Sequence, residues 1–346
     1  MRLLYVLLVF VPVGLISEYA GGPPLLTFAA AALGVVPLAG IIGEATEELA
    51  IRTGPRVGGL LNATLGNAAE LIITFFAIRA GLLDLVKASI TGSILGNLLL
   101  VMGLSILVGG LRNGRQRFDR VHAGIDSTML ILALIALVVP SIFSHAIEPN
   151  HAAVEYLSEG VAIAMLVVYA LELVYSFTTT TPVHPPQAHA EPKWSVRKAI
   201  VVLLVATGFI AWSSEVLVGV AEHVLVSLGW TEFFLGIVII PIVGNVAEHL
   251  VAVQVAAKDQ MQLSLEISLG SSLQIALFVA PVLVYVSLLL GNPMDLVFNE
   301  FELIALTAAA LIAALVALDG ESNWMEGAQL LVVYIILAMA FFFLPA

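Results

Sequence analysis

The stretch Gly58-Gly-Leu-Leu-Asn-Ala-Thr-Leu-Gly-Asn-Ala-Ala-Glu70 returns later in the chain as Gly236-Ile-Val-Ile-Ile-Pro-Ile-Val-Gly-Asn-Val-Ala-Glu248. The copies lie 178 residues apart, and both end in Gly-Asn-x-Ala-Glu. The same offset, without a gap, pairs the Gly-Ser-Ile-Leu that begins at Gly92 with the Gly-Ser-Ser-Leu that begins at Gly270. A chance match would not keep one offset at separated places, so the sequence predicts an internal repeat.

Composition restricts the class of protein that carries this repeat. The chain of 346 residues is 60% hydrophobic and 11% charged, with a mean hydropathy of +1.07. A soluble domain carries about 25% charged residues. Apolar runs of about 20 residues, each long enough to span a bilayer, continue well past the N-terminus, which excludes a signal peptide followed by a soluble domain. Because lipid offers no partner to backbone groups, we predict an all-α integral membrane protein.

We predict eleven membrane-spanning helices. They cover Leu3–Tyr19, Leu25–Glu44, Val57–Ile78, Ala88–Leu111, Gly124–Phe143, Leu157–Phe177, Ile200–Val220, Glu232–Ala257, Leu263–Leu290, Glu302–Leu318 and Met325–Leu344. The predicted organisation is an extra first helix in 1–20, a first repeat of five helices in 21–177, a cytoplasmic linker in 178–196 and a second repeat of five helices in 197–346. Because five is odd, the second repeat enters the membrane from the opposite side. Inverted repeats of this kind are typical of secondary transporters, although channels also contain them.

The basic residues predict the orientation. Eleven fall on one side of the predicted helices: Arg2, Arg52, Arg56, Arg112, Arg115, Arg117, Arg120, Lys193, Arg197, Lys198 and Lys258. Only Arg79 and Lys87 fall on the other side. By the positive-inside rule the N-terminus is cytoplasmic and the C-terminus is external. We expect the chain in the cell membrane of a prokaryote.

Two glutamates stand well inside predicted helices. A carboxylate in hydrocarbon costs at least a few kcal/mol, so Glu70 and Glu248 need an ionic partner, a proton or a bound cation. No predicted helix carries a Lys or Arg near its middle, which leaves the proton and the cation. A protonated glutamate that only joins two helices is the structural alternative. The recurrence of both glutamates in one motif favours ion binding.

Neutral oxygens accompany the two carboxylates. Asn67 and Asn245 each lie three residues before their glutamate, on the same helix face. Further candidate ligands on neighbouring predicted helices are Ser93, Asn97, Ser271 and Gln274. Ca2+ takes about six to eight oxygen ligands, and the absence of cysteine disfavours softer metals. We therefore predict Ca2+ and protons as transported ions, with Glu70 and Glu248 as the metal ligands and no resident cofactor.

Further acidic groups suggest an ion or proton pathway. Glu44, which the repeat pairs with Glu222, clusters with Glu47 and Glu48, and we interpret the last two as solvated helix ends. Glu215 and Glu222 are seven residues apart, so we expect them to share a helix face, with Glu215 lying deeper.

Three histidines, His184, His189 and His249, can each have a structural role instead of a functional one. His249 is either a proton relay or a packed core histidine, and we favour packing. We interpret His184 and His189, in the segment Thr178–Ser195, as parts of a flexible linker rather than as metal ligands.

At these motifs the chain resembles the cation/proton exchanger branch of the calcium/cation antiporter superfamily. The matching segments are Gly58–Leu71, Gly92–Gly103, Pro241–His249 and Ser271–Gln274. The resemblance implies an antiporter that moves Ca2+ out of the cytosol against inward proton flow, with the ion between Glu70 and Glu248. Eukaryotic relatives carry an acidic stretch in the central loop, whereas this segment has only Glu191, so no regulatory role is transferred.

Other functions remain as alternatives. A Na+-coupled calcium exchanger of the same superfamily comes first and a cation channel second. An intramembrane enzyme ranks below both, because the chain has no His-Glu-x-x-His motif. We therefore expect a transporter and not an enzyme. The net charge of −12 argues against a nucleic-acid partner, and the lipid bilayer is the expected surrounding. The sequence leaves open whether the chain forms a homo-oligomer.

Overall fold

The computed structural model describes residues 4–147, 151–178 and 192–344. Its elements are η1 (Leu4–Val9), α1 (Phe10–Tyr19), α2 (Pro24–Leu65), α3 (Ala68–Arg79), α4 (Leu83–Leu95), η2 (Gly96–Val101), α5 (Met102–Asn113), β1 (Gln116–Arg117), α6 (Arg120–Ile147), α7 (His151–Thr178), α8 (Val196–Gly219), α9 (Ala221–Leu228), α10 (Glu232–Phe234), η3 (Leu235–Ile239), α11 (Ile240–Ala256), α12 (Met261–Gln274), η4 (Ile275–Val279), α13 (Ala280–Leu290), α14 (Glu300–Ala317), β2 (Glu321–Ser322) and α15 (Trp324–Phe343). The two short strands pair antiparallel.

The helices confirm the predicted all-α membrane architecture. Within the described ranges, nine helices are long and apolar enough to cross a membrane, and a shorter apolar segment covers Leu4–Tyr19. Most predicted spans coincide with one such helix or with a helix interrupted by a π-helical segment. The predicted span Val57–Ile78 differs, because it is divided between the end of α2 and the whole of α3.

Helix α2 contains the predicted span Leu25–Glu44 and the first part of the next predicted span, because it folds back on itself. A straight helix of its 42 residues would be about 63 Å long, twice the thickness of the hydrocarbon layer. A methyl group at Gly58 would lie 3.0 Å from the Cα atom of Ala50. In a straight helix these positions, eight residues apart, would be separated by about 12 Å. The backbone therefore reverses direction between Ala50 and Gly58.

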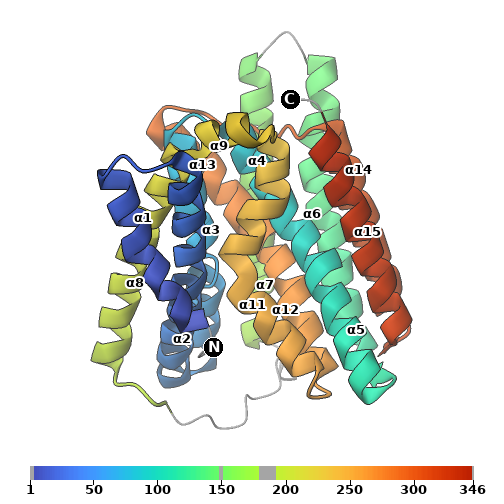
Figure 1. The fold of residues 1–346 in the computed structure, drawn as a ribbon. Coiled ribbons are helices and arrows are strands. Elements are labelled where there is room, and N and C mark those ends of the chain that lie inside the picture. Colours follow the sequence, from blue (N-terminus) through green and yellow to red (C-terminus); the bar gives the residue numbers. More distant parts are fainter. Residues whose placement is uncertain (1–3, 148–150, 179–191, 345–346) are drawn as a thin grey trace. The chain divides into compact units, whose positions relative to one another are not determined.

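The chain divides into two compact units. The first comprises Met1–Ala80, Tyr169–Trp230 and Val243–Ala247. Its helices α1, α2, α3 and α8 lie side by side (Figure 1). A core of Val11, Leu38, Ile42, Ala69, Ala206 and Ile210 joins them. Because Ala69 belongs to this core, packing fixes the start of α3 and with it the neighbouring Glu70.

The second unit comprises Gly81–Val168, Thr231–Ile242 and Glu248–Ala346. Its helices approach one another closely at glycines, which have no side chain beyond a hydrogen atom. Gly92 on α4 lies directly against the backbone of Ile237 in η3, and Gly236 lies against Ala88. Gly327 on α15 likewise lies against the backbone of α5. Small residues permit such approaches between membrane helices, so these three glycines have a packing role.

In the described part of this unit, three π-helical segments interrupt the helices: η2, η3 and η4. Pro241 and Pro281 each follow a π segment closely, η3 and η4 respectively, as expected for a residue without a backbone N–H. A glycine, Gly103, stands at the corresponding place after η2, so a proline is not required for the wide turn. Single π turns are frequent at functional sites, and η2 contains the candidate ligand Asn97.

Candidate functional site

Glu70 lies in the first turn of α3, where the helix begins after a break in the backbone. Asn67 is the N-cap residue of α3, with φ −92° and ψ 17°. The exposed fractions of Asn67 and Glu70 are 2% and 3%. The first backbone N–H groups of a helix lack partners within the helix, and the helix dipole adds positive potential there. The break at Asn67 therefore gives the Glu70 carboxylate a favourable site although it is buried.

Gly244 leaves space for this carboxylate. A methyl group at Gly244 would lie 3.2 Å from Oε1 of Glu70, closer than side chains normally pack. The next residue, Asn245, is 3% exposed. The first unit thus contains Glu70, both predicted asparagines and the glycine of the second Gly-Asn-x-Ala-Glu motif.

Glu248 belongs to the second unit and lies in the interior of α11, away from either end of the helix. Its side chain is half-buried, and its Oε2 accepts a hydrogen bond of 2.9 Å from Oγ of Ser271 on α12. The neighbouring Ser272 instead donates to the carbonyl of Ser268 in its own helix, at 2.9 Å. Of the two serines, Ser271 is therefore the one that holds the glutamate.

The remaining predicted ligands also belong to the second unit. Gln274 is the last residue of α12, directly before η4. Ser93 on α4 and Asn97 in η2 are 1% and 2% exposed, and α12 packs against both of these elements. In the described part of the chain, Nδ2 of Asn97 is buried and makes no hydrogen bond, which is unusual for a buried amide.

Among residues 4–147, 151–178 and 192–344, no group of three or more His, Asp or Glu side chains could hold a metal ion.

Comparison with known proteins places the chain in a family. The model of the family described as sodium/calcium exchanger protein matches residues 23–178 and 198–343. The chain belongs to this family.

Its relatives are similar over nearly their whole length. The Ca(2+)/H(+) antiporter ChaA of Bacillus subtilis is 45% identical over 341 residues, which cover 96% of this chain and 97% of the relative. The Ca(2+)/H(+) antiporter of Aphanothece halophytica is 43% identical over 98% of this chain and 96% of the relative. The crystal structure of the Ca2+/H+ antiporter protein YfkE superposes with a TM-score of 0.88 and 42% identity, covering 99% of this chain and 100% of that one. The integral membrane character predicted from hydropathy is thereby confirmed.

The predicted pathway residues of this family member have varied surroundings. Glu44 accepts a hydrogen bond of 2.5 Å from the Tyr5 hydroxyl. Glu215 was expected to lie deep, but its side chain is 56% exposed and pairs with Arg79 at 3.5 Å. Glu222 is exposed on α9, which is separated from α8 by Val220. Glu215 and Glu222, which were expected to share one helix face, therefore lie on two successive helices, α8 and α9.

The interpretation of Glu48 as a solvated helix end is also wrong. Glu48 is 6% exposed, and its Oε2 accepts a hydrogen bond of 3.0 Å from the backbone N–H of Trp194. Arg52 donates to the carbonyl of the same Trp194. Glu47 is exposed, as predicted. The predictions for His184, His189 and Glu191 lie outside the described residues.

His249 is buried, with an exposed fraction of 8%. Its Nε2 makes no hydrogen bond within the described residues. The burial agrees with a packed core histidine, the interpretation favoured from the sequence.

The sequence analysis missed a third buried carboxylate. Glu302, in the first turn of α14, is 1% exposed. It accepts hydrogen bonds from the Thr91 hydroxyl, at 2.8 Å, and from the backbone N–H of Asn299, at 2.9 Å. The pattern Asn299-x-x-Glu302 is that of a helix capping box. This pattern was the signal in the sequence that Glu302 lies at a helix start and bonds to the backbone there.

Proposed function

We propose that the chain is a secondary active Ca2+/H+ antiporter that exports Ca2+ from the cytosol by alternating access. The observation that carries the proposal is the Gly-Asn-x-Ala-Glu motif in each half of the chain. One of its glutamates lies at a helix start, and the other accepts a hydrogen bond from Ser271. Relatives that are 43% and 45% identical are Ca2+/H+ antiporters by name, which supports the same exchange here.

In this proposal Glu70 and Glu248 bind one ion together, with oxygens from Asn67, Asn245, Ser93, Asn97, Ser271 and Gln274 nearby. Two carboxylates that share a buried site cannot both remain charged when it holds no cation, so they take up protons. A Ca2+ ion compensates both charges at once and displaces up to two protons. Either cargo leaves the site nearly neutral, whereas the empty, deprotonated site carries two buried charges and resists the change of access. Exchange is therefore favoured over leak.

The inverted repeat supports a shared site. Helices α4 and α12 begin at Leu83 and Met261, 178 residues apart, and α5 and α13 begin at Met102 and Ala280 with the same separation. Residues 97–101 of η2 correspond to the whole of η4 at that offset. The two stretches that match the family model, 23–178 and 198–343, agree closely with the proposed repeats. In inverted-repeat transporters the ion binds where the repeats meet.

The decisive experiment is uptake of radiolabelled Ca2+ into proteoliposomes driven by a pH gradient. We expect uptake that stops when the gradient is dissipated with a protonophore, because protons provide the driving force. Uptake driven by a Na+ gradient instead would indicate the sodium-coupled alternative. Ca2+ flux that follows only the Ca2+ gradient, with no counter-ion, would indicate a channel. Either outcome contradicts the proposal.

Proton release tests the mechanism separately from transport. Adding Ca2+ to the purified protein in a weakly buffered solution with a pH-sensitive dye should release up to two protons for each bound ion. Acidifying the side that holds Ca2+ should raise the apparent KM there, because protons compete for the same carboxylates. Ca2+ binding without proton release would argue against the shared site even if antiport were found.

The proposed orientation has the N-terminus inside and the C-terminus outside. The natural chain has no cysteine, so a single introduced cysteine is the only thiol. In intact cells, an impermeant maleimide should label Arg79→Cys and leave Arg115→Cys unlabelled until the membrane is opened. Both native side chains are well exposed, at 61% and 81%, so access to the reagent depends on the side of the membrane. Labelling of Arg115→Cys from outside would reverse the topology.

A further inference from the structure

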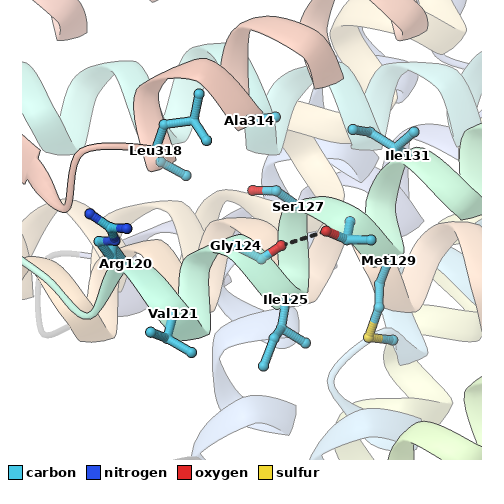
Figure 2. Close-up of a pocket in the computed structure, with 11 residues that line it drawn as sticks. Arg120, Val121, Gly124, Ile125, Ser127, Met129, Ile131, Ala314 and Leu318 are labelled. Atoms are coloured by element: carbon cyan, nitrogen blue, oxygen red, sulfur yellow. Dashed lines mark hydrogen bonds between the residues drawn. The ribbon is translucent and has the colours of Figure 1, made fainter.

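A groove lies between α6 and α14 in the second unit, and none of the predicted ion ligands lines it. It has a volume of about 630 Å3, and its lining includes Gly124 and Ile125 on α6 and Ala314 and Leu318 at the end of α14. Figure 2 shows Arg120 at one end of the groove and Ile131 at the other. Ile125 and Leu318 are 39% and 64% exposed. Since both helices are membrane spans, an exposed apolar surface of this kind faces lipid.

The polar side chains in the groove wall are turned toward their own helix. The Ser127 hydroxyl donates to the carbonyl of Ala123 at 2.7 Å, and the Thr128 hydroxyl donates to the carbonyl of Gly124 at 2.8 Å, the bond drawn in Figure 2. The wall therefore presents mainly apolar atoms, to which an acyl chain is suited. The guanidinium of Arg120 is the only charged group in the lining.

Arg120 differs from the two arginines that precede it most closely, Arg115 and Arg117. Arg115 and Arg117 both pair with Glu321, at 3.8 Å and 3.0 Å. Within the described residues Arg120 makes no ion pair. It is the first residue of α6, so it lies at the end of a membrane span, at the level of lipid headgroups. A guanidinium without a carboxylate is well suited to bind a phosphate through paired N–H groups.

We propose that this groove is a binding site for an anionic phospholipid. One acyl chain lies along α6 and α14, and the headgroup phosphate contacts Arg120. Two features select this ligand over others: the groove opens to the bilayer, which must fill it, and the one charge at its mouth is complementary to an anionic headgroup. The site is independent of the proposed transport function, because no predicted ion ligand lines it.

Native mass spectrometry of the purified full chain in detergent micelles tests the proposal. The probes are phosphatidylglycerol and phosphatidylcholine with identical acyl chains. Arg120→Gln should weaken phosphatidylglycerol binding by about tenfold and leave phosphatidylcholine binding nearly unchanged, because only the charged contact is lost. Arg112→Gln is the matched control, since Arg112 is exposed and lies outside the groove. Equal effects of Arg120→Gln and Arg112→Gln would overturn the proposal.

A second variant tests the acyl-chain part of the site. Gly124→Leu should fill the groove and weaken binding of both lipids. A methyl group at Gly124 meets no atom within 4 Å, so the added side chain occupies open space rather than clashing with the protein. Unchanged lipid binding in this variant would overturn the proposal, provided that its melting temperature matches the parent chain. If the parent chain forms a dimer and Gly124→Leu dissociates it, the groove is an interface with a second copy of the chain. That result would also overturn the lipid-site proposal. The Arg120→Gln comparison stands whether or not Gly124→Leu folds.

Discussion

The surroundings of Glu70 and Glu248 differ although the two residues end the same five-residue motif. Glu70 is 3% exposed and lies in the first turn of a helix that starts at the motif. Glu248 is half-buried inside a continuous helix, and Ser271 holds one of its carboxylate oxygens. The positive end of a helix dipole therefore favours the first carboxylate, and a side-chain hydroxyl bonds the second.

The backbone departs from α-helical geometry at different places in the two copies. In the first copy the break is at Gly66 and Asn67, inside the motif. In the second copy it is the π segment η3, which ends before Pro241. Ala63 stands at the corresponding position of the first copy. The motif thus fixes which polar groups are present, while neighbouring residues fix where the helix opens.

The largest expected effect comes from removing either charge. Glu70→Gln and Glu248→Gln should each reduce pH-driven Ca2+ uptake to background, because the neutral amide can neither carry a proton nor compensate Ca2+. Both variants should retain the elution volume and melting temperature of the parent chain. If one variant kept substantial proton-coupled flux, the two glutamates would not be equivalent in function, and the structural difference between them would extend to their roles.

Ser271→Ala should have a smaller effect, confined to the second copy. A hydrogen bond to a charged group contributes about 1.5–3 kcal/mol, so the apparent affinity for Ca2+ should fall by about tenfold or more. Ser272→Ala is the control, because that hydroxyl bonds only to the carbonyl of Ser268. Ca2+ titration of both variants measures the difference. Equal Ca2+ affinities in the two variants would show that Ser271 does not contribute to Ca2+ binding.

Gly244→Ala should have a weaker effect, through Glu70. The added methyl group would lie 3.2 Å from Oε1 of Glu70, and the carboxylate end of the side chain can shift to relieve the contact. We expect a rise in the apparent KM for Ca2+ with little loss of maximal rate. Gly208→Ala on α8, where a methyl group meets no atom within 4 Å, is the control. A KM that is unchanged relative to this control would mean that the space beside Glu70 has no bearing on binding.

The smallest effect is expected at Glu215, outside both motifs. Its pair with Arg79 is exposed, and exposed pairs contribute about 0–1 kcal/mol. Glu215→Gln should therefore leave the Ca2+ uptake rate and the melting temperature close to those of the parent chain. A large loss of Ca2+ uptake with an unchanged melting temperature would indicate that Glu215 is part of the ion pathway, as the sequence suggested.

The sequence was sufficient for the membrane fold, and several of the site residues that it predicted are buried or hydrogen-bonded in the structure. Hydropathy predicted the helices because lipid forces apolar segments to satisfy their own backbone groups. Glu70, Asn67 and Asn245 proved to be buried, and Glu248 proved to be bonded to the predicted Ser271. The exposure of Glu215 was not predicted, because one-dimensional position within a span does not tell which side of the helix is covered by neighbours.

What the sequence by itself determined was the all-α membrane class, the family and the kinds of polar groups available to an ion, since each depends on composition and on local spacing. Only the tertiary structure decided that α2 folds back at Ala50 and Gly58, that α3 starts at the motif while α11 runs through it, and that Glu302 is buried against Thr91. These features depend on contacts between segments distant in sequence. A helix breaks, bends or buries a charge where such contacts offset the cost, and no local pattern encodes them.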